Sequence, residues 1–431
     1  MDEKSSESVS RAAFRYPNFR FYMMARFLTT ISSEMQSVAV GWQVYEITHQ
    51  PLDLGLVGLA QFLPGICLFL FAGHTADRIA RKKIVRTCCG AFSLCSLLLL
   101  ALTLHGLASA YPIYIVLLMN GAVRAFNAPA SQSFVPLLVA TDVLPSAIAW
   151  SSSIFQTATI VGPMIGGLLY GFTGTPIFVY ASAAFGYSAA FVLIGLVRLP
   201  QASRAQPAVS GGMVLEGLRY IWRNKLIFGA ISLDLFAVLL GGAVALLPVY
   251  AREILRTGAI GLGILRSAPG VGAVLMSLVM AHWPLRTRAG LIMLWCVFGF
   301  GLTTVVFGLS RNLWLSLAML FLTGATDTVS VIVRSTMIQL GTPNEMRGRV
   351  SAVNMVFVGA SNEVGQFESG ITAQWFGTVP AVVLGGIGTI VVVMLWSWWF
   401  PSLRQMDKLI SQPLEAVLAE AMTAHGGADN E

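Results

Sequence analysis

Long apolar segments alternate with short polar loops along nearly the whole chain. A helix that crosses a membrane needs roughly 20 mostly apolar residues, and twelve segments reach that length. Because the loops between them are short, neighbouring helices are expected to run antiparallel. The pattern predicts an all-α membrane protein with twelve transmembrane helices at about residues 19–45, 54–76, 84–106, 111–135, 143–170, 175–198, 226–250, 259–282, 289–309, 312–338, 350–375 and 379–400.

One polar stretch is longer than the other loops and divides the predicted helices into two sets of six. We therefore predict an N-terminal six-helix bundle at residues 1–198, with a cytoplasmic N-terminus, and a cytoplasmic central loop at 199–225. A second six-helix bundle follows at 226–400, and a polar tail at 401–431.

The two halves repeat short features at matching distances along the chain. Arg15-Tyr16 precedes the first predicted helix, and Arg219-Tyr220 precedes the seventh. Asn120–Arg124 in the fourth helix corresponds in place to Thr323–Asp327 in the tenth. Weak internal symmetry of this kind is typical of transporters built from two related halves, with a substrate site between the halves near the middle of the membrane. We expect two pseudo-symmetric bundles around such a site.

Composition supports a membrane protein and narrows the classes of function. The chain is 56% hydrophobic and 11% charged, whereas soluble domains carry about 25% charged residues. The net charge of +7 does not indicate a nucleic-acid partner, because most cations lie in short loops between apolar segments. No phosphate-binding Gly-x-x-x-x-Gly-Lys-Ser/Thr loop is present, and the cysteines have no metal-ligand spacing with histidine. We expect no enzymatic activity, no cofactor and no metal.

The basic loops predict the orientation of the chain. A dense group of cations follows Gly73 between the second and third apolar segments, and positively charged loops stay in the cytoplasm. With that loop inside, almost all loop cations fall on the same side, and the opposite side holds Arg252, Arg256 and Arg311. The bias predicts a multi-pass protein of the cell (inner) membrane with both termini in the cytoplasm.

The basic loop carries an acid among its cations. Asp77 lies at the end of a helix beside four cations, and such a cluster can pair with a neighbouring helix terminus and hold one side of a two-state protein closed. A signal for orientation alone would need the cations but not the aspartate, so we favour a combined role. The gate motif predicted here comprises Gly73, Asp77, Arg78, Arg81 and Lys82.

The fifth predicted helix carries a group of small residues and a proline. Glycines four apart let another helix approach closely, and a proline inside a helix frees a carbonyl and introduces a kink. Static packing and a moving hinge are equally compatible with this composition. The residues concerned are Gly162, Pro163, Gly166 and Gly167.

These motifs resemble those of the major facilitator superfamily. Its loop signature, Gly-x-x-x-Asp-Arg-x-Gly-Arg-Arg/Lys, is matched from Gly73 to Lys82 except that Ala80 replaces the second glycine. The run Gly162–Gly167 is similar to the Gly-Pro-x-x-Gly-Gly core of the superfamily's antiporter-type motif. The segments Ala128–Ala130, Val135–Leu138 and Arg347–Val350 resemble the efflux branch that includes the enterobactin exporters. The resemblance implies the major facilitator fold and a transport function.

Charged residues within the apolar segments are the candidates for chemistry. Each costs at least about 2.5–3.5 kcal/mol at the centre of a membrane helix unless it is paired or hydrated. We expect them to face the space between the halves and to pair there, with Glu34 opposite Arg124, while Asp234 is expected to be a structural pairing residue. The predicted residues for proton coupling or the substrate cavity are Glu34, Arg124, Asp327, Arg334, Glu363 and Glu368, although a structural ion pair is an equally good reading of each one.

The functional prediction is a secondary active transporter. A carboxylate in a poorly hydrated cavity can load and release a proton, so Glu34, Glu363 or Glu368 could couple proton entry to export. We expect proton-driven export (antiport) of a small organic compound, such as a siderophore or a drug, by alternating access of a monomer. One alternative is a proton-coupled importer of a small nutrient on the same fold, and another is a non-transporting membrane sensor. The expected partners are the small-molecule substrate, protons and the lipid bilayer.

Overall fold

The computed structural model describes residues 12–198, 211–283, 285 and 287–406, and every regular element in these ranges is a helix. The predicted N-terminal end (1–11), the first part of the central loop (199–210) and most of the predicted tail (407–431) lie outside the described residues.

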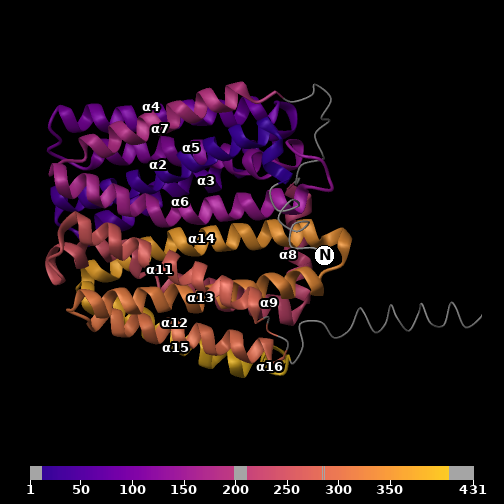
Figure 1. Ribbon diagram of the computed structural model, residues 1–431. Helices are drawn as coiled ribbons and strands as arrows, with labels where there is room; N and C mark the ends of the chain where they lie inside the picture. Colours follow the sequence, from indigo (N-terminus) through magenta and orange to yellow (C-terminus); the bar gives the residue numbers. More distant parts are fainter. Residues whose placement is uncertain (1–11, 199–210, 284, 286, 407–431) are drawn as a thin grey trace, which may run out of the picture.

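The first six long helices pack together as one bundle, the N-terminal bundle (Figure 1). In this bundle α2 packs on α6 and α7, α3 on α5, and α4 on α5 and α7. Two short 3-10 turns, η1 (Ala12–Arg15) and η2 (Val135–Leu137), accompany them. The long helices are α2 (Pro17–Thr48), α3 (Pro51–Arg78), α4 (Arg81–Leu104), α5 (Tyr111–Gln132), α6 (Leu144–Thr173) and α7 (Ile177–Leu196).

The second half forms the C-terminal bundle, in which α11 packs on α13, α12 on α13 and α15, and α9 on α14 and α15. The short helix α16 (Pro401–Arg404) follows the last long helix. The long helices of this bundle are α9 (Lys225–Leu240), α11 (Gly258–His282), α12 (Ala289–Leu309), α13 (Leu313–Gly341), α14 (Asn344–Phe376) and α15 (Thr378–Trp399).

Ten of the described helices are long and apolar enough to cross a membrane, counting α9 and its continuation to Ile254 as one. The helices α2 and α14 are longer still, at 32 and 33 residues, and they pack among the others. Their apolar character is lower because each carries several charged residues, including Glu34 and Glu363. The two most polar long helices are therefore the ones that contribute carboxylates near the boundary between the bundles.

Two predicted segments differ from the structure. The segment 199–225, expected as a loop, contains the helix α8 (Gly211–Arg223). The helix expected at 226–250 is broken after Leu240 and continues through η3 (Ala243–Leu246), α10 (Leu247–Val249) and the π-helical turn η4 (Tyr250–Ile254).

The break follows the pair Gly241-Gly242, where glycine weakens a helix and Pro248 downstream cannot donate a backbone hydrogen bond. The break leaves the carbonyl of Gly242 free to accept a hydrogen bond from the hydroxyl of Ser369 on α14, at 3.2 Å. The broken segment is thus tied to α14.

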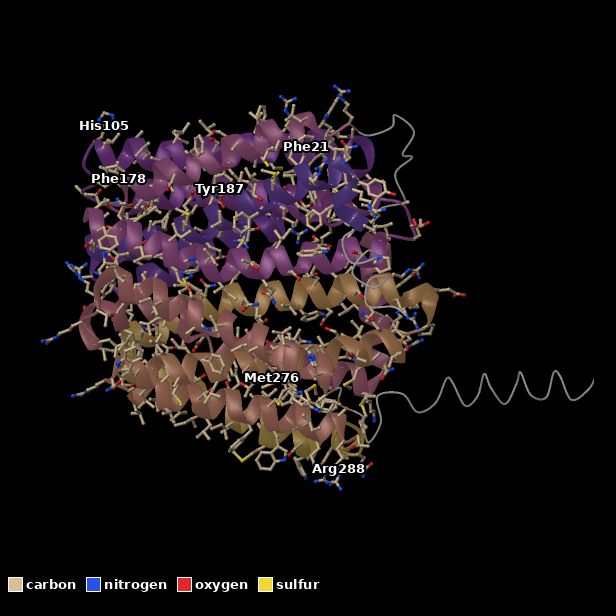
Figure 2. All side chains as sticks on the ribbon, in the orientation of Figure 1. Phe21, His105, Phe178, Tyr187, Met276 and Arg288 are labelled. Carbon is tan, nitrogen blue, oxygen red and sulfur yellow. The ribbon has the colours of Figure 1, made fainter. Side chains whose placement is uncertain are left out.

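The molecule has two ends, which we name after residues that lie there. The Arg81 end holds the turn between α3 and α4 together with α8 and α16, and the Tyr45 end holds the turn between α2 and α3 (Figure 1). Figure 2 shows His105 and Phe178 at the Tyr45 end and Arg288 at the Arg81 end.

The two bundles meet along α6 with α11 and along α3 with α14. At the first crossing a Cβ atom on Gly167 would lie 2.7 Å from the carbonyl oxygen of Ala259 and 2.8 Å from Cα of Gly263, so the two backbones touch. At the second crossing a Cβ on Gly55 would lie 3.2 Å from Cα of Gly370. All of these positions lie in the parts of the helices nearer the Tyr45 end, which places the closest contact of the bundles there.

Candidate functional site

A cavity of about 400 Å³ lies between the bundles. The N-terminal bundle lines it with residues of all six of its long helices, and the C-terminal bundle supplies Arg266, Glu363 and Gln366. A second hollow of about 210 Å³ shares Thr29 and Phe155 with the first and reaches Tyr22 near the start of α2. The two hollows together lead from the middle of the molecule toward the Arg81 end.

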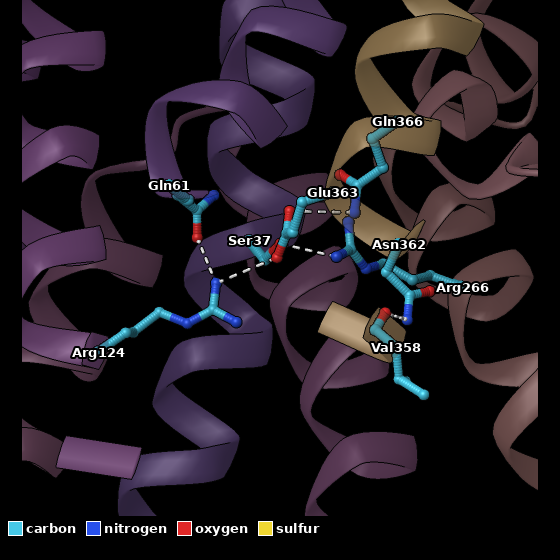
Figure 3. Close-up of polar contacts among 8 residues, drawn as sticks. All are labelled: Ser37, Gln61, Arg124, Arg266, Val358, Asn362, Glu363 and Gln366. Atoms are coloured by element: carbon cyan, nitrogen blue, oxygen red, sulfur yellow. Dashed lines mark hydrogen bonds and ion pairs between the residues drawn. The ribbon is translucent and has the colours of Figure 1, made fainter. Parts of the chain in front are cut away.

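Arg124 and Glu363 connect the two bundles inside this cavity (Figure 3). The Nη1 atom of Arg124 lies 3.5 Å from Oε1 of Glu363 and donates a hydrogen bond to Oε1 of Gln61 at 3.1 Å. Gln366 donates to the other oxygen of Glu363 at 3.4 Å. The carboxylate is therefore held by one group from each bundle, and relative motion of the bundles must change its partners.

Arg266 forms a second polar link across the boundary and is not among the site residues predicted from the sequence. Its Nη2 atom donates to the hydroxyl of Ser37 on α2 at 2.7 Å, next to the Arg124–Glu363 pair in Figure 3. The signal was present in the sequence, because Arg266 is a lone charge inside the apolar segment 259–282. Such a residue is a candidate for a functional site by default.

Glu34 lines the same cavity, and the charges of Arg266 and Arg124 both act on it. The expected pairing of Glu34 with Arg124 is wrong, since the ion pair that Arg124 forms is with Glu363. The reason lies in the packing of the bundles, which brings α14 opposite α5 at this level. A Cβ on Gly162 would lie 2.6 Å from Cβ of Glu34, so this glycine lets α6 seat against α2 beside the carboxylate.

Three other predicted residues lie outside the cavity. Arg334 of α13 forms a buried ion pair with Asp234 of α9, as expected for Asp234. Asp327 borders a separate void of about 10 Å³ together with Asp234 and Ser330, and it makes no ion pair or hydrogen bond with another described residue. Glu368 accepts a hydrogen bond from Thr372 on its own helix at 2.7 Å. Asp327 and Arg334 are seven residues apart and share one face of α13, and that face packs inside its own bundle instead of lining the cavity.

The cations of the predicted gate motif bind helix ends within the N-terminal bundle. Arg81 donates to the carbonyl of Ser133 just after α5 at 3.2 Å, and Lys82 donates to the carbonyl of Gly195 in the last turn of α7 at 2.9 Å. The last carbonyls of a helix lack partners and carry partial negative charge, which explains the choice of cations. The backbone of Gly73, Asp77 and Arg78 belongs to α3, and their side chains lie outside the described set.

The predicted small residues of the fifth helix, now α6, form close contacts. Gly162 faces Glu34, Gly167 faces α11, and a Cβ on Gly166 would lie 2.9 Å from Cα of Met35 on α2. Pro163 contributes its carbonyl oxygen, which would lie 2.6 Å from a Cβ on Gly263. The motif thus brings α6 against α2 and α11 at once, on both sides of the boundary between the bundles.

A polar network closes the boundary at the Tyr45 end. Tyr45 of α2 donates a hydrogen bond to Glu253 of η4, and Arg252 of η4 lies 3.8 Å from Glu46 of α2. Tyr170 donates to the second oxygen of Glu46 at 2.6 Å. The guanidinium of Arg252 also lies 5.9 Å from the ring centroid of Trp42. In the sequence Arg252 reads as a loop cation, so the pattern does not predict this closure.

The arrangement is that of a site with access from one side. The bundles touch at the Tyr45 end, and the cavity with its two cross-bundle links leads to the Arg81 end. Opening the other side would require the contacts of Tyr45 with Glu253 and of Glu46 with Arg252 to separate.

Comparison with known proteins gives concordant results. A family model described as a transmembrane secretion effector matches residues 8–427. The enterobactin exporters EntS of Shigella boydii serotype 4 (strain Sb227) and Escherichia coli (strain SMS-3-5 / SECEC) are each 29% identical over 384 residues, covering 87% of this chain and 86% of the relative.

Solved structures with the same fold include the nucleoside transporter NupG, with a TM-score of 0.68 and 14% identity over 89% of this chain and 99% of that one. A mutant of the peptide transporter POT has a TM-score of 0.72 and 11% identity over 91% of this chain and 96% of that one. At such low identity these structures are informative about the fold alone. With a family match along nearly its whole length and the fold of known transporters, the chain belongs to the transmembrane secretion effector family of the major facilitator superfamily and is a multi-pass membrane transporter of the efflux type.

Proposed function

We propose that the protein exports a small, polar organic compound from the cytoplasm in exchange for protons. The observation that carries this proposal is the cavity in which Glu363 lies opposite Arg124, near Arg266 and Glu34, with access from the Arg81 end. The basic loops favour a cytoplasmic position for that end and for both termini, in the cell membrane. The cavity would then receive substrate from the cytoplasm.

The lining of the cavity indicates the chemistry of the substrate. The amides of Gln61, Asn120 and Gln366 and the hydroxyls of Thr29 and Ser33 outnumber the aromatic rings of the lining. Ligand sites are generally more apolar than this, so the polar lining favours a compound rich in hydroxyl and carbonyl groups. Carbonyl oxygens would accept from the guanidinium groups, and hydroxyls would donate to the carboxylates.

Competition for the carboxylates explains how protons could drive export. An ionised Glu363 or Glu34 accepts hydrogen bonds from substrate hydroxyls, and a proton on the carboxylate removes one of those acceptors. Proton and substrate would therefore exclude each other, as antiport requires. Relatives that carry the name of enterobactin exporters support the outward direction.

A second candidate function is import of an organic anion together with a proton. The observation that favours it is the Arg124–Glu363 pair itself. A proton on Glu363 would release Arg124 to bind an anion, so proton and anion would bind together. The two mechanisms thus predict opposite relations between the flux of protons and the flux of substrate.

The test uses the full-length protein in proteoliposomes with a pH-sensitive dye inside. Enterobactin, smaller hydroxyl-rich compounds and organic anions are each added with a proton gradient imposed in either direction. Export by antiport predicts proton flux opposite to the flux of a hydroxyl-rich compound. Proton flux in the same direction as an anion would support the second candidate. Absence of any coupled flux in both directions would contradict proton coupling.

We also propose that the monomer is the working unit, because the cavity lies between the two bundles of one chain. The nearly complete coverage of relatives that act as exporters also favours transport over a sensor without transport.

A further inference from the structure

The helix α8 is seated firmly on the C-terminal bundle. A Cβ on Gly217 would lie 2.8 Å from the carbonyl oxygen of Arg349, so the backbones of α8 and α14 touch. Glu216 forms an ion pair with Arg349, and the hydroxyl of Tyr220 donates to the carbonyl of Gly341 at 3.0 Å. Ile221 is buried in an apolar cluster with residues of α9, α13 and α14. One face of α8 therefore packs against the C-terminal bundle.

The other face of α8 is exposed and has a definite composition. Leu215, Leu218 and Trp222 are exposed, Trp222 to 72%, and they recur at helical spacing. Arg219 and Arg223 are exposed on the same stripe. A stripe that combines large apolar side chains with cations is typical of helices that lie in the plane of a membrane interface.

The cations beside these apolar residues have no acidic partner among the residues that the structure describes. Arg219, Arg223 and the neighbouring Lys225 are exposed and form no ion pair with a described residue. The acid nearest to them in the chain, Glu216, is already paired with Arg349. The stripe thus presents uncompensated positive charge, which is complementary to an anionic surface.

Aromatic contacts connect this stripe to the membrane-spanning surface. The ring of Trp222 lies 5.1 Å from that of Phe228 in α9, and Phe228 lies 5.9 Å from Phe400 at the end of α15. Trp399, beside Phe400, is 57% exposed. Tryptophan is enriched where a membrane meets water, so this cluster marks the level of the interface at the Arg81 end. The exposed stripe of α8 is continuous with this aromatic cluster, which we call the aromatic belt.

We propose that the exposed stripe of α8, with Arg219, Arg223 and Trp222, binds the headgroups of anionic phospholipids in the leaflet at the Arg81 end, together with Lys225 at the start of α9. The apolar side chains insert at the level of the aromatic belt, and the cations contact the phosphates above it. Because α8 is paired with the first turns of α14, bound lipid holds that end of α14 at the interface. The proposal concerns a surface outside the cavity and does not depend on the coupling mechanism.

The test measures lipid binding to the full-length protein directly. Purified protein in a neutral detergent is titrated with phosphatidylglycerol or phosphatidylcholine, and the retained lipid is counted by native mass spectrometry. The variant is the double substitution Arg219→Gln and Arg223→Gln. The matched control is Lys83→Gln and Arg404→Gln, which removes two exposed cations from the same end of the molecule without touching α8.

The proposal predicts that phosphatidylglycerol binds in preference to phosphatidylcholine and that the α8 variant weakens its binding by about tenfold or more, given the usual contribution of each basic residue at an anionic membrane surface. The control pair should bind as the unmodified protein does. Equal loss in both variants, or no loss in the α8 variant, would overturn the assignment. Complete competition by inorganic phosphate would also overturn it, because that result indicates a general anion site. Thermal unfolding of each variant without lipid confirms that the fold is intact.

Discussion

Arg124 of α5 and Glu363 of α14 form an ion pair between the two bundles, with Nη1 and Oε1 3.5 Å apart. Half of the Arg124 side chain is exposed, whereas the Glu363 side chain is only 17% exposed. The arginine thus reaches from the open cavity to a carboxylate that is mostly enclosed. Water or substrate in the cavity can therefore reach the Arg124 side of this ion pair, whereas the Glu363 side is shielded by protein.

Replacing Glu363 by Gln is expected to abolish transport driven by a proton gradient while leaving exchange of substrate in the absence of a gradient. The amide keeps the size and a hydrogen-bond acceptor but takes up no proton. The measurement is substrate flux in proteoliposomes with and without an imposed gradient. Glu368→Gln is the matched control, because Glu368 lies on the same helix, contacts Thr372 and does not line the cavity. Equal losses in the two variants would remove Glu363 from the coupling mechanism.

Glu46→Gln should favour opening at the Tyr45 end. The change removes the charge that attracts Arg252 but keeps an oxygen that can accept the hydrogen bond from Tyr170. The pair is partly exposed, so the loss is about 0.2–1 kcal/mol, which shifts the open population by about fivefold at most.

The shift can be measured with a cysteine placed at Val40, a buried residue of the cavity lining, in a chain with Cys67→Ser. A thiol reagent that does not cross membranes is added outside intact cells, and the rate of labelling should rise with Glu46→Gln. Arg311→Gln is the control, since Arg311 is exposed and has no ion pair among the described residues. An unchanged labelling rate in both variants would argue against the idea that the polar network at the Tyr45 end holds that side closed.

Gly167→Ala should impair both stability and transport. The added Cβ would meet the backbone of α11 at 2.7–2.8 Å, and the two helices would have to move apart. Overpacking of this kind costs about 1–3 kcal/mol. The control is Gly65→Ala in α3, where a Cβ would meet nothing within 4 Å and the substitution is expected to be neutral or slightly stabilising. Thermal unfolding in lipid nanodiscs and flux in proteoliposomes give the two readings, and a similar result for both variants would show that the crossing tolerates a side chain.

Lys82→Met is expected to lower the stability of the N-terminal bundle by about 1 kcal/mol, because the carbonyl of Gly195 loses a charged donor at a helix end. Lys83→Met removes an exposed charge at the next position, whose side chain makes no hydrogen bond or ion pair with a described residue. Thermal unfolding of the two variants separates a capping role from a general effect of charge. A larger loss from Lys83→Met would contradict the capping assignment.

For the buried pair of Asp234 and Arg334, we expect removal of one partner to be more harmful than removal of both. Asp234→Leu leaves an uncompensated buried charge and should cost about 3–5 kcal/mol, whereas adding Arg334→Leu should recover most of that loss. The pair lies outside the cavity, so the double variant is expected to retain transport. Equilibrium unfolding of the single and double variants tests the first statement, and flux tests the second. A double variant that folds but does not transport would give this pair a functional role.

The sequence predicted the helical architecture well because membrane helices are marked by length and apolar character alone. The break after Leu240 was also visible in principle, since Gly241-Gly242 and Pro248 interrupt the segment. The partner of Arg124 was not predictable, because the choice between Glu34 and Glu363 depends on which helix of the other bundle lies opposite. The separation of Asp327 and Arg334 from the cavity was not predictable for a second reason, because it depends on which face of α13 turns toward its own bundle.

If the bundles rotate about the contact of Gly167 with Ala259 and Gly263, each bundle would act as a lever with unequal arms. With a rise of 1.5 Å per residue, α6 extends about 35 Å from Gly167 to its start at the Arg81 end and about 9 Å to its other end. Rotation about this fulcrum multiplies displacement by about four from the short arm to the long arm. A parting of about 2 Å at the Tyr45 network would accompany a movement of about 8 Å at the mouth of the cavity. A small separation of the bundles at the closed Tyr45 end would therefore accompany a much larger movement at the open Arg81 end.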